Sequence, residues 1–201
     1  MSIPTRAQIL AAAARLYAEH GFRGTTTRAV AEAADVNEVT LFRIFGSKQT
    51  LILEAMRTHG AATPGHALPE VPQDPEAELT AWAAAARKAL LARRSMIIQA
   101  MGDAELNPEM PKCASQGAAA AYNALRAYFA RLRDAGFVPE HADAGFAANL
   151  LIGALFHDAM SRPVMPAVFP PAAEAAAVYA RLTLRAIGFE SRARRKGHRA
   201  S

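Results

Sequence analysis

The stretch from Gly21 to Leu53 constrains the fold of this chain most, because it places two short helical patterns on either side of a very short turn. Apolar residues mark one helix face before the turn and a second face after it, at Val30, Ala31, Ala34, Val36, Leu41 and Phe45. Residues 34–37 between the two patterns have room only to reverse the chain. This spacing is typical of a helix-turn-helix, whose second helix presents its N-terminus and exposed side to a DNA major groove.

The same stretch resembles the DNA-binding domain of TetR-type bacterial transcriptional regulators. The resemblance is dense from about Thr5 to Met56, needs no gap and covers roughly a quarter of the chain. It is carried by Gly21-Phe22, Thr25-Thr26, Ala31, Thr40-Leu41-Phe42, Phe45 and Ser47-Lys48. The resemblance implies a dimeric DNA-binding protein, most simply a repressor, whose larger helical body binds a small effector and then releases a palindromic operator.

Composition agrees with a well-buried helical protein. Hydrophobic residues make up 52% of the 201 residues, and the mean hydropathy is +0.03. The longest apolar run, from Phe146 to Phe156, is too short to cross a bilayer. The first residues lack the basic and apolar segments of a secretory signal, and a single cysteine, Cys113, excludes an internal disulfide. We therefore expect an all-α, cytoplasmic protein.

Helix starts and breakers predict three domains. Thr5 and Gln8 have capping-box spacing for the first helix, and Ser47 is placed to cap the fourth. A Pro- and Gly-rich segment, 61–75, predicts a linker. The predicted body helices span 75–92, 94–106, 115–135, 141–161 and 171–187. The domains are then a helix-turn-helix head with its connecting helix (1–59), an effector-binding and dimerisation body (75–188) and a basic, disordered tail (189–201).

Three Gly-Phe pairs predict helix C-termini, because glycine accepts the left-handed conformation and the next apolar side chain folds back onto the last turn. They are Gly21-Phe22, Gly136-Phe137 and Gly188-Phe189. At the other end of a helix, Asp74-Pro75 predicts a cap followed by proline at the first helical position.

The second helix of the motif carries the predicted DNA-reading residues. Asn37 is placed to cap this helix and to project Glu38 and Val39 toward base edges, with Thr40 and Arg43 one turn further along. Thr26, Arg28 and Lys48 stand at helix starts, where backbone N–H groups and positive side chains hold phosphate. The alternative is that these residues are only caps and solvated charges.

The family resemblance matches this site at positions that usually touch DNA, namely Thr26, Arg28, Thr40, Phe42 and Lys48. The chain also departs from the family. Phe42 replaces a frequent Tyr and Ile44 a frequent His, so two phosphate donors are lost, and Val39 replaces a frequent Gly. These departures predict a modest intrinsic affinity.

Large side chains scattered among alanines predict a cavity for an apolar ligand in the body. They are Trp82, Met96, Met101, Tyr122, Phe129, Phe146, Phe156 and His157, with Tyr122 and His157 as polar contacts. Taken singly, each also fits an ordinary place in helix packing. The resemblance favours the ligand-binding alternative, with coupling to the head through about residues 48–59.

A homodimer is predicted through residues 141–161 and 171–187. These segments are rich in alanine and allow close helix approach, and the family pairs its last two helices in this way. One helix-turn-helix reads few base pairs, so specificity normally needs two half-sites on a symmetric dimer.

Two other classes of protein are alternatives, an enzyme and a DNA-binding protein without an effector. The six histidines show no spacing typical of a zinc site, and no phosphate loop or nucleophile elbow appears, so we expect no enzyme, no metal and no cofactor. The second alternative is a DNA-binding dimer without an effector, whose body docks another protein. The net charge of +5 weighs little, because residues 185–201 hold six Lys/Arg against one Glu. That tail is either solvated or adds non-specific attraction to nucleic acid.

Overall fold

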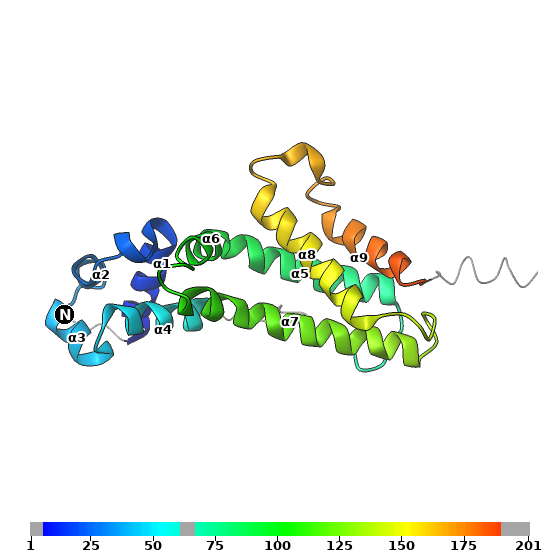
Figure 1. Ribbon diagram of the computed structural model, residues 1–201, viewed down its shortest axis with the longest axis horizontal. Coiled ribbons are helices and arrows are strands. Elements are labelled where there is room, and N and C mark those ends of the chain that lie inside the picture. The colour runs from blue at the N-terminus through cyan, green and yellow to red at the C-terminus, as the bar shows by residue number, and fades with distance from the viewer. Residues whose placement is uncertain (1–5, 61–66, 190–201) are drawn as a thin grey trace, which may run out of the picture. The chain divides into compact units, whose positions relative to one another are not determined.

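The computed structural model describes residues 6–60 and 67–189, and within these ranges every regular element is a helix (Figure 1). The all-α prediction is therefore confirmed. Contacts divide the chain into two compact units, one formed by residues 1–62 and 93–117 and the other by 63–92 and 118–201. The predicted cap at Thr5 and nearly all of the predicted tail lie outside the described residues.

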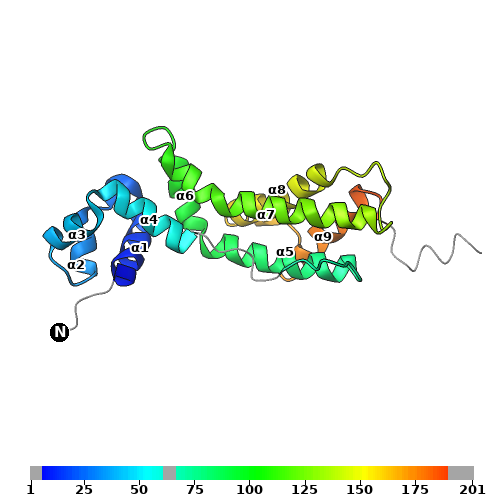
Figure 2. The same cartoon turned by 90° about the horizontal axis from the view of Figure 1, so that it is seen from below.

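The first unit is built around its N-terminal helix. Its elements are α1 (Arg6–Gly24), α2 (Thr27–Ala33), α3 (Glu38–Phe45), α4 (Lys48–Gly60), α6 (Arg94–Gly102) and the start of α7 (Glu109–Asp134). Helix α1 packs against α2, α4 and α6 (Figure 2). Ile9, Tyr17 and Ile52 are fully buried at its centre. An apolar stripe on α1 thus anchors α2, α4 and α6, while α3 packs on α2 and α4.

Gly21 interrupts α1 where the Gly-Phe pair predicts an end. Its φ of 65° and ψ of −174° are accessible only to glycine, and they set a kink before the last residues of the helix. Beyond the kink, the hydroxyl of the buried Thr25 donates to the carbonyl of Gly21 at 2.7 Å. This bond fixes the path of the chain into α2.

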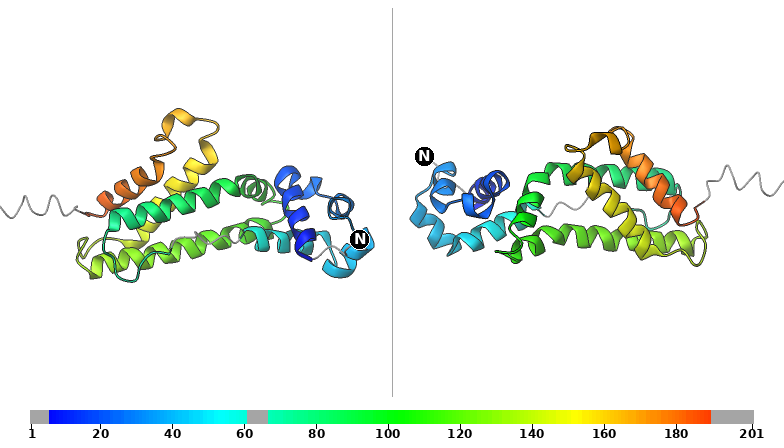
Figure 3. Two further views of the ribbon diagram at one scale, coloured as in Figure 1. Left: turned by 180° about the vertical axis from the view of Figure 1, so that it is seen from behind. Right: turned by 45° about the horizontal axis from the view of Figure 1, so that its top comes forward.

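The second unit consists of α5 (Pro75–Ala92), the rest of α7, α8 (Ala144–Ser161), a short 3-10 helix (Pro166–Val168) and α9 (Ala175–Ala186). Helix α5 packs against both α8 and α9, and these two pack against each other (Figure 3). Their core includes Leu79, Trp82, Leu125, Phe129, Leu151, Leu155 and Leu184, all buried. The unit is a helix bundle with α5 at the centre of its contacts.

The predicted helix ends are confirmed where a cap or a glycine marks them. Gly136 and Gly188 have φ of 72° and 83°, and the amides of Phe137 and Phe189 bond back to Leu132 and Leu184 at 2.8 and 2.9 Å. The Asp74 carboxylate accepts from the amide of Ala77 at 3.2 Å, as expected for a cap before Pro75. Ser47 does the same for Thr50 at 3.0 Å.

Four helix boundaries differ from those predicted. Helix α9 begins at Ala175 instead of 171. Helix α6 ends at Gly102 instead of 106, and α7 begins at Glu109 instead of 115. Pro111 lies in the first turn of α7, where its missing N–H would have no helical partner in any case. Helix α8 begins at Ala144 instead of 141, because Asp143 caps it through bonds to Gly145 and Phe146 at 2.8 and 2.9 Å.

The division of the chain by packing is not consecutive, unlike the predicted domains 1–59 and 75–188. Residues 93–117 contact the head, since Met96, Ala100, Met110 and Cys113 join the same apolar cluster as α1 and α4. Helical periodicity identifies the apolar face of α6 but not the helix that it covers. By contacts, the predicted helix 94–106 belongs to the first unit and most of 115–135 to the second, while the functional division into a head (1–59) and a body (75–188) stays a prediction.

Candidate nucleic-acid interface

The turn between α2 and α3 is held by backbone bonds. The amides of Ala34 and Val36 donate to the carbonyls of Val30 and Ala31, each at 3.0 Å. Asp35 between them has a φ of 53°, a conformation that aspartate tolerates better than most residues. Behind the turn Leu41 and Phe45 are 1% and 5% exposed, so the predicted inward face of α3 is confirmed.

The first turn of α3 faces solvent. The side-chain oxygen of Asn37 accepts from the amide of Val39 at 2.9 Å, which confirms the predicted cap. This bond uses the carbonyl oxygen of the side chain and leaves its amide group available as a donor. Val39 and Phe42 are 72% and 49% exposed, and Arg43 is exposed as well. The helix therefore presents a mixed polar and apolar edge to solvent.

Glu38 has a partner that the sequence did not indicate. The hydroxyl of Thr27, the first residue of α2, donates to one oxygen of the half-buried Glu38 carboxylate at 2.5 Å. The two helix starts are thereby tied together, and only part of the Glu38 carboxylate remains for a base. A separation of eleven residues across a turn gives no periodic pattern, so this contact could not be predicted.

The residues predicted to hold phosphate flank α3. The hydroxyl of Thr26 accepts from the amide of Ala29 at 3.1 Å and caps α2. Arg28 pairs with Glu32 at 2.9 Å on the exposed side of α2, and this hydrogen bond raises the pKa of Arg28. The Lys48 ammonium lies 4.4 Å from the centre of the Phe22 ring, a cation–π contact. Burial lowers the pKa of Lys48, while the carboxylate of Asp103 opposes that shift.

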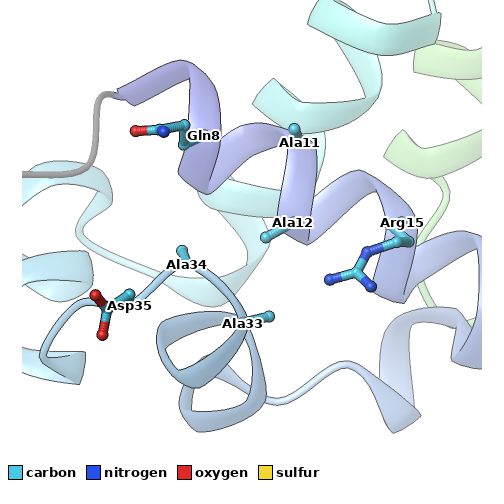
Figure 4. Close-up of a pocket in the computed structure, with 7 residues that line it drawn as sticks. All are labelled: Gln8, Ala11, Ala12, Arg15, Ala33, Ala34 and Asp35. Carbon is cyan, nitrogen blue, oxygen red and sulfur yellow. The ribbon is translucent and has the colours of Figure 1, made fainter.

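A hollow of about 570 Å³ lies beside the turn, within the first unit (Figure 4). It is lined by the polar side chains of Gln8 and Arg15 on α1 and of Asp35 in the turn, and by Ala11, Ala12, Ala33 and Ala34. All seven lining residues belong to α1, the end of α2 and the turn, and none to α3.

The eight residues predicted to line an effector cavity fall into different surroundings. Trp82 and Phe129, 3% and 1% exposed, share the core of the second unit, whereas Met96 is buried in the core of the first. Met101 and Phe146 are each 58% exposed. Phe156 is half-buried on α8. A shared cavity for all eight stays a prediction.

The two predicted polar contacts of the effector also lie apart. Tyr122, half-buried on α7, lines a polar hollow of about 660 Å³ together with Arg126, Arg133 and His141. His157 is exposed on α8 and meets the Phe169 ring edge-on at 5.0 Å between ring centres. Within the second unit, only Trp82 and Phe129 of the predicted set share one apolar cluster of buried residues.

A buried ionic cluster in the second unit was missed. The Asp158 carboxylate, 0% exposed, accepts from the Arg87 guanidinium at 3.0 Å and from the Tyr179 hydroxyl at 2.8 Å, and it also pairs with Arg162. Burial favours the neutral acid, but the bonds from Arg162, Tyr179 and Arg87 together hold the pKa of Asp158 below its usual value. Burial and the bond to Asp158 raise the pKa of Tyr179 to about 12. The cluster ties α5, α8 and α9 together.

Cys113 is buried in the core of the first unit, and its thiol donates to the carbonyl of Leu53 at 3.6 Å. Burial raises the pKa of this thiol, which makes it less reactive. Across residues 6–60 and 67–189, no three His, Cys, Asp or Glu side chains gather as a metal site would require. Among the same residues, no helix combines the length and apolar character that a membrane span needs.

The fold and the exposed N-terminus of α3 define a helix-turn-helix protein. Residues 9–55 match the sequence model of a family described as "Bacterial regulatory proteins, tetR family". Over 58 residues the chain is 43% identical to YvkB of Bacillus subtilis, an HTH-type transcriptional regulator described as uncharacterized. That match covers 29% of this chain and 31% of YvkB. The chain thus spans less than a third of the length of the curated relatives it matches.

Solved structures extend the likeness to the remaining helices. The TetR family transcriptional regulator PfmR from Thermus thermophilus is 25% identical, with a TM-score of 0.64, over 91% of this chain and 99% of PfmR. The regulator FadR from Bacillus subtilis, solved in complex with stearoyl-CoA, is 14% identical and shares the fold, with a TM-score of 0.68 over 91% of this chain and 97% of FadR. Residues 9–55 thus match the tetR family of bacterial regulatory proteins, and the described helices share the fold of solved TetR family regulators.

Proposed function

We propose that this protein is a sequence-specific DNA-binding transcriptional regulator that represses by occupying a palindromic operator. The exposed first turn of α3 carries the proposal. It offers an amide donor at Asn37, a carboxylate at Glu38 and an apolar surface at Val39, the kinds of groups that distinguish base pairs in the major groove. Phe42 and Arg43 extend this edge by one turn.

The flanking residues hold the DNA backbone in this proposal. Arg28 is exposed at the start of α2, and Lys48 begins α4 next to the end of α3. Phosphate contacts set the register of a protein on the duplex but carry no sequence information, so these two cations supply affinity. Arg28 must exchange its bond to Glu32 for one to phosphate, which reduces the net gain.

A homodimer through α8 and α9 accounts for apolar side chains that the second unit leaves in solvent. Phe146 and Leu150, one helical turn apart on α8, are 58% and 39% exposed, and Leu182 on α9 is 53% exposed. Burying them against the same residues of a second copy makes an isologous interface. Two heads then present two α3 helices to successive major grooves of a palindrome.

A small apolar effector is proposed to release the DNA by favouring a body geometry in which the heads no longer match the two half-sites. FadR, which shares the fold, was solved with stearoyl-CoA, and the apolar side chains of this body suit a ligand of similar character. The matching experiment is a thermal-shift series with apolar compounds, including stearoyl-CoA as one probe. A raised melting temperature together with DNA release supports effector control. Uniform failure favours a DNA-binding dimer whose body docks another protein.

The DNA-reading proposal is tested by selecting bound duplexes from randomised DNA at ~0.15 M salt and sequencing them. A short palindrome with separated half-sites is the expected result. Enrichment without any motif contradicts sequence reading by α3.

A further inference from the structure

Asp103 stands at the C-terminal end of α6 and reaches the kink of α1. One oxygen of its carboxylate accepts from the backbone amide of Phe22 at 3.0 Å and from the hydroxyl of Tyr17 at 3.1 Å. Both donors belong to the last part of α1, on either side of Gly21. The carboxylate therefore fixes the direction in which the chain leaves α1.

Side chains from the end of α6 also pack closely against Gly21. A Cβ atom at this position would lie 2.7 Å from the side-chain oxygen of Gln99 and 3.8 Å from the Asp103 carboxylate. Only glycine provides both this space and the φ of 65°. The end of α6 and the kink of α1 are thus fitted to each other.

Phe22, whose backbone amide donates to Asp103, also carries the aromatic ring that the Lys48 ammonium contacts. The Lys48 ammonium lies 4.4 Å from the centre of the Phe22 ring, and α4 begins at that lysine. Asp103 attracts the ammonium as well, which opposes the effect of burial on the pKa of Lys48. Moving the Phe22 backbone would shift the ring and release the side chain of Lys48 to many rotamers.

We propose that Asp103 is a positioning residue for DNA binding, which holds Phe22 and through its ring sets Lys48 in place for a backbone phosphate. This inference rests on the proposed DNA-binding function. It adds α6 to the parts of the chain that determine DNA affinity, although no residue of α6 belongs to the helix-turn-helix.

A charge effect and a positioning effect of Asp103 predict opposite changes in DNA affinity for Asp103→Ala. Removing a carboxylate near DNA tightens binding if only its charge matters, because repulsion from phosphate is lost. Removing a positioning group weakens binding. We expect Asp103→Ala to lower the affinity for a random-sequence duplex of about 30 base pairs about fivefold at 0.15 M salt, the effect of one lost phosphate contact. Asp103→Asn keeps a carbonyl oxygen for both donors and should bind nearly as the unaltered protein does.

A double-mutant cycle with Lys48→Ala separates positioning from general damage. If Asp103 acts through Lys48, Asp103→Ala changes the affinity and the salt dependence little once Lys48 is already alanine. Additive losses, or tighter binding by Asp103→Ala, overturn the inference. Asp134→Ala is the control, because it removes an exposed carboxylate of the second unit and should leave binding unchanged.

Stability is followed in every variant by thermal unfolding. Should Asp103→Ala fail to fold, Phe22→Leu takes its place: it removes the ring beneath Lys48, keeps an apolar side chain, and should lower affinity by the same factor. Unchanged binding by Phe22→Leu overturns the inference. If the unaltered protein selects no DNA motif, the proposed function fails. If it selects a motif but the cycle is additive, only the role of Asp103 fails.

Discussion

The two units place their charged side chains differently. In the first unit, the charged side chains of α2 and α3 face solvent and the core is apolar. The second unit buries the carboxylate of Asp158 and exposes several large apolar side chains. Arg28 and Arg43 are exposed beside buried Leu41 and Phe45. By contrast, Asp158 is 0% exposed, and Phe146 and Leu182 are more than half exposed. The first unit also exposes apolar side chains, Val39 and Met101 among them, but its α2–α3 edge offers charges to the proposed DNA ligand. In the second unit, Phe146 and Leu182 lie in the proposed dimer interface.

The largest loss of stability is expected when the buried cluster around Asp158 is broken. Asp158→Ala leaves the guanidinium groups of Arg87 and Arg162 without their carboxylate, so we expect a loss of about 3–5 kcal/mol in the free energy of unfolding. Denaturant unfolding followed by circular dichroism measures this loss. A loss below about 1 kcal/mol would mean that the cluster does not hold α5, α8 and α9 together.

The same cluster predicts a pH dependence. The pKa of Asp158 is depressed in the folded state, so its stabilisation is fully present above the unfolded value of about 3.9 and is lost as pH falls through the lower folded value. Stability measured between pH 7 and 2 should therefore fall more steeply below about pH 4 in the unaltered protein than in Asp158→Asn. Parallel curves for the two proteins would contradict the assignment.

Leu182→Glu on α9 tests whether the exposed apolar side chains of α8 and α9 form a dimer interface. An unpaired carboxylate buried in a dimer interface costs at least about 2 kcal/mol, so the dissociation constant of the dimer should rise roughly 30-fold or more. Sedimentation velocity across micromolar concentrations measures this. Val71→Glu is the matched control, since Val71 is 69% exposed and lies before α5, outside the proposed interface. A monomeric unaltered protein at these concentrations would refute the dimer.

Asn37, at the exposed start of α3, has a capping role and a proposed base-reading role that substitutions can separate. Asn37→Ala removes both the cap on α3 and the amide donor, whereas Asn37→Ser keeps a capping oxygen. We expect both variants to lose discrimination at one base position by about 1–3 kcal/mol, and only alanine to lower the melting temperature. Selection from randomised duplexes measures the first effect and thermal unfolding the second. If serine kept the original motif, Asn37 would be a cap alone.

The smallest effect is expected at Lys48. Lys48→Ala should weaken binding to every sequence about fivefold at 0.15 M salt and lower the slope of log affinity against log salt by roughly one. Fluorescence anisotropy over a salt series gives both values. Lys112→Ala, an exposed lysine paired with Glu109 in the first unit, should change neither. A change of the preferred sequence in Lys48→Ala would contradict a phosphate role.

Local sequence patterns predicted the parts of the fold that local chemistry determines. Asn37 and Ser47 cap their helices, and Gly136 and Gly188 end theirs, because each needs only backbone groups within a few residues. The exposed edge of α3 was predictable for the same reason, together with the family resemblance. Whether those side chains touch DNA stays a prediction.

Contacts between distant segments were not predictable from one sequence. The sequence gives no sign of the partners of Asp158, because its bonds to Arg87 and Tyr179 join residues on three helices. The role of Asp103 was not predictable from the sequence, because its partners in α1 lie more than eighty residues away. The packing of α6 with the head was missed for the same reason, since an amphipathic pattern identifies a buried face without naming its partner.

In the proposed complex, two heads joined through the apolar faces of the second units read one palindrome. Sedimentation equilibrium can count the protein chains on the selected duplex, with a half-site duplex of equal length beside it. We expect two chains on the palindrome and an affinity for the half-site roughly 100-fold or more weaker. One chain per duplex, with equal affinity for palindrome and half-site, would contradict it.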